Sequence, residues 1–281
     1  MTRLTGALGR ALFVLLLIGM PSLFLTSANS DTTIVVALVA LVAAVFTFVE
    51  YNSAYPSFVE FRDAPPFNRI RFLSLFISVF ALSVIARGAT DPSTLTLAVS
   101  AIGNDLGHLI DFPYSPVRLM VLMLPDNASA SLQNAVRTAA GISYFVSIVA
   151  LAIFVLLLRY RRWPSNLGAF NVWTNMPTFD PTAGGDVVQR LERDANLNLI
   201  FGFLLPFLIP AIVKATGTIF NPISLENPHT LIWMMTAWAL IPASLLMRGI
   251  AIGRVAEMIS NQRRRAYAEA QGQTDEALAP A

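Results

Sequence analysis

Three polar side chains at a regular spacing form the group in the sequence most suited to chemistry. Asp105, His108 and Asp111 follow one another at intervals of three residues. On a helix such residues project from one face, where two carboxylates and an imidazole could share a metal ion or a proton. The same residues would also suit an ordinary solvated helix face, and the glycines of IGNDLG weaken the helix. These three residues are therefore a candidate metal or proton site, and the solvated helix face is the favoured interpretation.

A second pattern combines two prolines with a lysine. Pro206, Pro210 and Lys214 lie at intervals of four in FLLPFLIPAIVK. Proline frees backbone carbonyls of the preceding turn, as in the broken helices of transporters, so these residues could line a transport path. Alternatively, the prolines are simply tolerated and the lysine reaches the membrane surface. Carboxylates expected as a counter-ion for a buried lysine are Asp31, Asp105 and Glu226.

Small residues repeat at a spacing of four in two apolar stretches. Ala40 and Ala44 form one pair, and Gly249 and Gly253 form the other. Small residues at this spacing let helix backbones approach closely. The two pairs are therefore predicted to be helix-docking surfaces, used either within the chain or with a partner.

Other chemistry is not favoured. The chain has no cysteine, which excludes disulfides, Cys-ligated zinc and thiol catalysis. It has no phosphate-binding glycine loop, no HExxH motif and no pair of histidines on one apolar stretch to hold a haem, so no cofactor is expected. A serine protease pairing Ser143 with His229 is disfavoured because His229 is expected in a loop. No alternation of basic and aromatic residues suggests nucleic-acid binding.

Composition identifies the elements that must carry these residues. Of 281 residues, 55% are hydrophobic and only 13% charged, and the mean hydropathy is +0.62. These values exclude a soluble globule and indicate an integral membrane protein. A membrane-crossing helix needs about 20 mostly apolar residues. The candidate stretches are residues 11–30, 32–49, 72–86, 138–158, 195–213 and 227–247. The third is shorter, but it is bracketed by Arg71 and Arg87, whose long side chains can reach both membrane surfaces. The expected fold is all-α and polytopic, with six transmembrane helices in a single domain over residues 1–269.

The segments between the spans are predicted to lie at the membrane surface. Residues 88–137 form an outer cap whose two short apolar runs, LTLAVSAI and VRLMVLMLP, read as interfacial helices. Residues 159–194 form a cytoplasmic loop, whose Trp and Phe residues favour interfacial anchoring. The last span continues as a long helix into the cytoplasm, and residues 270–281 are expected to be a disordered tail.

Orientation follows from the positive charges, because basic loops stay on the cytoplasmic side. The other side receives only Arg87, Arg118, Arg137 and Lys214 of the 19 basic residues. Both termini are therefore predicted to be cytoplasmic. A competing interpretation makes residues 1–28 a cleaved signal peptide, since a basic start precedes an apolar run and LTSA.

These observations lead to a functional hypothesis. Arginine makes up nearly all of the basic residues, and alanine is abundant, which suits a bacterium with a GC-rich genome and hence the bacterial inner membrane. The spans have few ionisable groups in their middle thirds, where ion or solute paths normally place them. The leading expectation is a non-enzymatic accessory, assembly or scaffolding subunit. Its partners would be the lipid bilayer and another membrane protein or a second copy. The alternatives are a transporter or channel and an enzyme with its site in the outer cap.

Overall fold

The regular structure of the described residues is entirely helical. The computed structural model describes residues 3–25, 30–161, 163–164, 170–180, 182–216 and 224–277. Its helices are α1 (Arg3–Phe24), α2 (Ser30–Asn52), α3 (Phe67–Gly88), α4 (Thr94–Ile110), α5 (Pro116–Leu122), α6 (Ala130–Tyr160), α7 (Val172–Asn175), α8 (Val187–Thr216) and α9 (Pro228–Ala277). By length and composition, six of them could cross a membrane: α1, α2, α3, α6, α8 and α9. The expectation of an all-helical chain with six candidate spans is confirmed.

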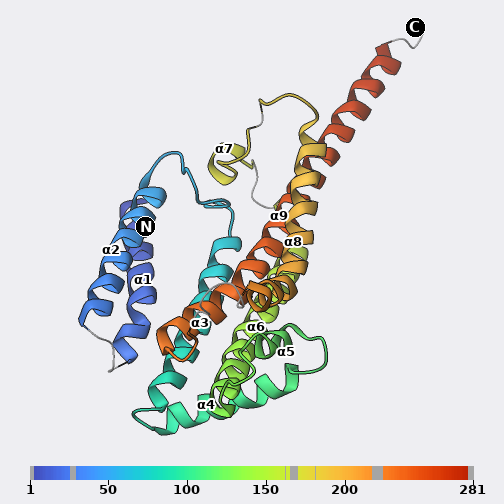
Figure 1. Ribbon diagram of the computed structural model, residues 1–281. Helices are drawn as coiled ribbons and strands as arrows, with labels where there is room; N and C mark the ends of the chain where they lie inside the picture. The colour runs from blue at the N-terminus through green and yellow to red at the C-terminus, as the bar shows by residue number, and fades with distance from the viewer. Residues whose placement is uncertain are drawn as a thin grey trace.

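The six long helices form an elongated bundle with two distinct ends (Figure 1). The helices α4 and α5 lie at one end, which we call the α4 end. The helix α7, the beginning of α1 and the projecting part of α9 lie toward the other, the α7 end (Figure 1). The chain therefore begins and ends toward the same end of the bundle.

Several helices are longer than the uncharged stretches suggested. The helix α3 spans 22 residues, whereas residues 72–86 alone would reach only about 22 Å. The added first turn contains Arg71, whose Nε donates to Ser244 Oγ at 3.2 Å and whose guanidinium lies over the Phe67 ring. An arginine with such partners can lie inside the end of a helix. The helix α3 therefore begins at Phe67, five residues before the predicted start of the span.

Two apolar clusters fill the bundle, one toward each end. The cluster at the α4 end joins α3, α5, α6 and α9 through residues such as Val79, Val117 and Met235. The cluster at the α7 end contains Phe61, Phe67, Phe154, Trp163 and Ile252, with one or more aromatic residues from each of three segments.

The loops at the α7 end are ordered by internal contacts instead of by surface anchoring. Trp163, expected as an interfacial anchor, is only 4% exposed, and its ring centroid lies 5.7 Å from that of Phe61. The Glu50 carboxylate accepts the backbone N–H groups of Ser57, Phe58 and Val59. It thus caps the loop that follows α2.

The helix α9 extends well beyond the bundle (Figure 1). Its 50 residues run from Pro228 to Ala277, which agrees with a last span that continues as a helix. The helix also covers most of the region expected to be a disordered tail, and residues 278–281 lie outside the described part. Residues 261–271 of this projecting part are all exposed.

Candidate functional site

The structure does not assemble the predicted metal ligands. Asp105 and His108 lie exposed on α4, whereas Asp111 follows the end of that helix and is only 6% exposed in its side chain. Its Oδ2 lies 2.7 Å from Arg137 Nε, and its Oδ1 lies 3.0 Å from Arg118 Nε. Among the described residues, no three His, Cys, Asp or Glu side chains are placed to hold a metal ion. The Asp111 carboxylate is instead neutralised by arginines of α5 and α6, which no local sequence pattern connects to it.

The glycines of the same segment have a packing role. A Cβ added to Gly141 of α6 would lie 2.5 Å from Gly107 Cα, and one added to Gly107 would lie 3.0 Å from the Arg137 carbonyl oxygen. The backbones of α4 and α6 are therefore in direct contact. This contact explains why Gly107 is present in α4 although glycine weakens a helix. The close approach of α4 and α6 brings Asp111 within reach of Arg137.

The prolines of α8 do not break that helix. It runs continuously from Val187 to Thr216, and Pro206 and Pro210 are both buried. Because Pro210 has no N–H, the carbonyl of Pro206 lacks its normal helical donor. The indole Nε1–H of Trp238 on α9 donates to that carbonyl at 3.1 Å in a buried environment. The freed carbonyl thus has a side-chain partner from the neighbouring helix.

Lys214 lies at the α4 end, at the surface. Its Nζ is 3.1 Å from Asp126 Oδ1 and 3.1 Å from the Leu124 carbonyl oxygen, and its side chain is 48% exposed. Its carboxylate partner is Asp126, whereas Asp31, Asp105 and Glu226 were considered only for a buried lysine, and Lys214 is not buried. Asp126 was not chosen because it follows α5, whose contact with α8 is a tertiary feature.

The small residues predicted to dock helices are used within the chain. A Cβ on Gly249 would lie 2.8 Å from the Ala195 carbonyl oxygen, so α8 and α9 touch backbone to backbone there. Gly253 has more room, since its Cβ would lie 3.9 Å from Ala195 Cβ. Ala40 and Ala44 are 3% and 7% exposed on α2, which packs on α1.

A cluster of charged side chains at the α7 end was not predicted from the sequence. Arg248 of α9 holds both oxygens of Glu60, at 2.7 and 2.9 Å, and Asp194 Oδ1 at 2.9 Å. The hydroxyl of Thr178 also donates to Glu60 at 2.7 Å, and Asn198 donates to Asp194. These residues are far apart in the sequence, so no spacing signal could have found them. Because the donors and acceptors are matched, the cluster joins the loop before α3 to α8 and α9 and carries no free reactive group.

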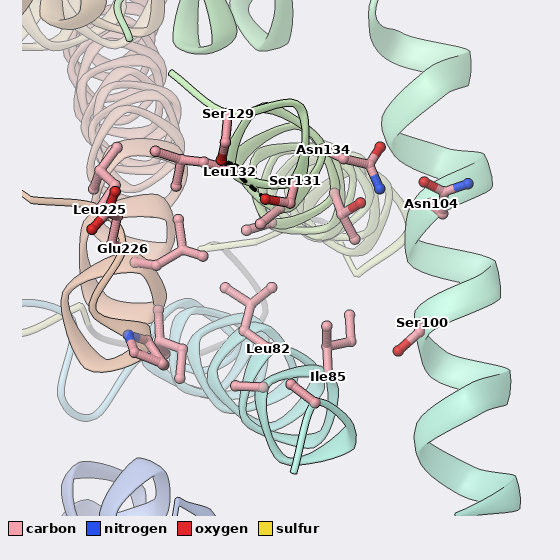
Figure 2. Close-up of a pocket in the computed structure, with 18 of the residues that line it drawn as sticks. Leu82, Ile85, Ser100, Asn104, Ser129, Ser131, Leu132, Asn134, Leu225 and Glu226 are labelled. Carbon is pink, nitrogen blue, oxygen red and sulfur yellow. Dashed lines mark hydrogen bonds between the residues drawn. The ribbon is translucent and has the colours of Figure 1, made fainter. Parts of the chain in front are cut away.

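A cavity of about 890 Å³ opens at the α4 end between α3, α4, α6 and the start of α9 (Figure 2). Its apolar wall is formed by Leu82 and Ile85 of α3, Leu132 of α6 and Ile232 of α9. Its polar residues are Ser100, Asn104, Ser129, Ser131, Asn134, Thr138 and Glu226. A cavity of this size, largely apolar with a few polar groups, has the character of a ligand site.

The electrostatics of this cavity are simple. Of the described residues that line it, Glu226 alone is ionisable, and no basic side chain is among them. Ser129 and Ser131 hydrogen-bond to each other at 2.9 Å at its rim (Figure 2). From the sequence, Glu226 was considered only as a counter-ion for Lys214. The cavity itself could not be predicted, because its walls come from four separate helices.

Comparison with known proteins adds no relative. The chain matches no protein-family model, and searches of curated proteins and of solved structures found no significant match.

Proposed function

We propose that this chain is a non-enzymatic protein of the bacterial inner membrane that acts as an accessory, assembly or scaffolding subunit. In this proposal α1, α2, α3, α6, α8 and α9 cross the membrane, and α4 and α5 lie at its outer surface. Both termini lie in the cytoplasm. The distribution of charge supports this orientation, because only four basic residues fall in the segments proposed to lie outside. They are Arg87 at the end of α3, Arg118 in α5, Arg137 in α6 and Lys214 near the end of α8.

The observation that carries the proposal is the projecting part of α9. The other surfaces considered for docking are already used inside the chain, since Gly249 packs on α8 and Trp163 lies in the apolar cluster. From residue 261 to Ala277 the helix extends by roughly 25 Å. A single helical segment of this length is only marginally stable in water unless something packs against it. We therefore expect a partner to bind there.

The chemistry of this segment fits a docking role better than catalysis. Arg263, Arg264 and Arg265 begin it, Tyr267 is 71% exposed, and Glu269 follows. Arg263 pairs with Asp186 at 3.0 Å, which anchors the base of the segment to the start of α8. Arg264, Arg265, Tyr267 and Glu269 are all exposed, so they can contact a partner.

Site-specific photocrosslinking tests the proposal. A photoreactive amino acid placed at Tyr267 in cells should give one defined crosslinked product, while the same group at exposed Tyr55 should not. Ala268→Pro, which breaks the projecting helix, should abolish the product without lowering the amount of folded protein. A product of twice 30.6 kDa would identify self-association, and a different mass would identify another protein. No product from Tyr267, or an equal product from Tyr55, would contradict the proposal.

The transporter alternative has weaker support. A broken fifth span should leave backbone carbonyls free for an ion, but the Pro206 carbonyl is bound by Trp238. Lys214 is paired at the surface with Asp126 and is not part of a buried path. An enzyme with its site in the outer cap would need Asp105 and His108 to act together with Asp111, which faces two arginines instead.

A further inference from the structure

The cavity at the α4 end has a polarity gradient along its depth. On α6 the lining runs from Ser129 and Ser131 at the helix start to Thr138 and Ala139, and on the α9 side it runs from Glu226, which precedes the helix, to Ile232. On α3 it runs from Leu82 to Ala89 at the helix end, a rise of roughly 10 Å. Ser129, Ser131 and Glu226 thus lie in the outer part, and Leu82, Ile85 and Ile232 line the inner part, to which Thr138 adds one hydroxyl. A polar mouth above an apolar wall suits an amphiphile.

The surroundings supply a source for such a ligand. The helix α4, which forms one wall, exposes the large apolar side chains of Leu95, Leu97, Ile102 and Leu109. An amphipathic helix with an exposed apolar face lies in the interface plane of a bilayer. The cavity would then open at the level of the headgroups. This placement rests on the topology proposed above.

The charge in the cavity selects the headgroup. Glu226 is the one ionisable residue among the described lining residues, and the polar residues nearby on α4 and α6 are uncharged. An anionic headgroup would meet a carboxylate with no basic side chain to compensate it, whereas an ammonium group would form a charge-assisted hydrogen bond. We propose that this cavity binds a membrane amphiphile with an ammonium headgroup. Glu226 holds the headgroup, and Leu82, Ile85 and Ile232 contact the chain.

A reactive reporter in the wall of the cavity tests this proposal. The chain has no cysteine, so Ala135→Cys places a single thiol in the lining, and Ala98→Cys places one on an exposed part of α4 outside it. Alkylation of each thiol is followed in nanodiscs of digalactosyldiacylglycerol, an uncharged lipid without an ammonium group. Nanodiscs expose both faces of the bilayer, so the result does not depend on orientation. The probes are dodecylamine, dodecanol and dodecanoate, which have the same chain and different headgroups.

We expect dodecylamine to slow alkylation at position 135 with an affinity about tenfold higher than dodecanol, and dodecanoate to be the weakest. Glu226→Gln should reduce the affinity for dodecylamine to that for dodecanol and leave dodecanol unchanged. Glu257→Gln, a change at an exposed carboxylate of the α7 end, should have no effect. The thermal midpoint of each variant verifies folding.

Four results would each overturn the proposal. The first three are no protection of position 135, equal protection by all three probes, and equal protection of position 98. The fourth is a dodecylamine preference that survives Glu226→Gln. None of these results affects the crosslinking outcome at Tyr267, so the two proposals can fail separately.

Discussion

At the scale of single residues, Asp111 was considered as a metal ligand, but in the structure it forms ion pairs with two arginines. Its carboxylate is nearly buried and lies between Arg118 and Arg137, whereas His108, three residues earlier, is exposed. A buried carboxylate is stable as an anion only where opposite charge and hydrogen bonds replace water. Arg137 supplies a hydrogen bond and both arginines supply positive charge, so Asp111 connects the end of α4 to α5 and α6.

The replacement of Asp111 separates this role from metal binding. We expect Asp111→Asn to lower the free energy of unfolding by about 1–3 kcal/mol, because two arginines lose their charged partner. His108→Ala, at an exposed position, should change it by less than about 0.5 kcal/mol. Thermal unfolding in detergent, with and without added Zn²⁺, measures both. A Zn²⁺-dependent midpoint lost in His108→Ala would restore the metal hypothesis.

At the scale of helices, the contact between α8 and α9 depends on the absence of a side chain at one glycine. Gly249→Ala would place a methyl group 2.8 Å from the Ala195 carbonyl oxygen, and a backbone atom cannot rotate away. We expect this change to destabilise the protein by about 1–3 kcal/mol. Gly253→Ala meets nothing closer than 3.9 Å and should stabilise the helix by up to about 1 kcal/mol. Paired unfolding measurements check the opposite signs, and two changes of the same sign would show that the interface is not set by Gly249.

The base of the projecting helix has a pH-dependent contact. The backbone N–H of Val188 and the guanidinium of Arg263 lower the pKa of Asp186. Because this pKa is below the unfolded value of about 3.9, the contact contributes fully above that pH and is lost as the pH falls through the folded pKa.

This contact can be measured as a distance. Spin labels at Gln189→Cys and Gln262→Cys should show a narrow distance distribution at neutral pH that broadens as the pH is lowered below about 4. The distribution in an Asp186→Asn background should already be broad at neutral pH and should change little. A distribution that is unaffected by both acid and Asp186→Asn would mean that Arg263 does not anchor the helix.

At the scale of the whole molecule, the two ends of the bundle differ in charge and in construction. Ion pairs at the α4 end join Asp111 and Asp126 to their basic partners, and Arg248 joins three segments at the α7 end. Charges placed at helix ends avoid the cost of ionised groups within hydrocarbon. The same sorting underlies the proposed orientation.

Single-cysteine labelling tests that orientation. We expect Asn127→Cys, exposed at the α4 end, to react with a membrane-impermeant maleimide in bacteria whose outer membrane has been permeabilised. Gln262→Cys, exposed on the projecting helix, should react only after the inner membrane is opened. The cysteine-free parent provides the background. The reverse pattern would place the α7 end outside.

The helical class and the six candidate spans could be predicted because they depend on local composition: backbone groups in hydrocarbon must be satisfied within a helix. Span boundaries were less predictable. Arg71 was taken to bound a span, yet it lies inside α3, where it binds Ser244 of α9 and covers the ring of Phe67. The aromatic residues of the loops were expected at the surface, but Trp163 is buried against Phe61 of another loop and Phe170 of its own.

The amino-acid order by itself determined which segments are helical and apolar enough to span, since an uncharged run of about 20 residues is a property of neighbours in the chain. Only the tertiary structure decided which charges meet. Asp111 with Arg137, Lys214 with Asp126 and Arg248 with Glu60 are each brought together by helix packing. The cavity at Glu226 was decided in the same way, because its walls belong to four helices. Contacts across a bundle depend on which faces pack, and that choice is made by all the helices together.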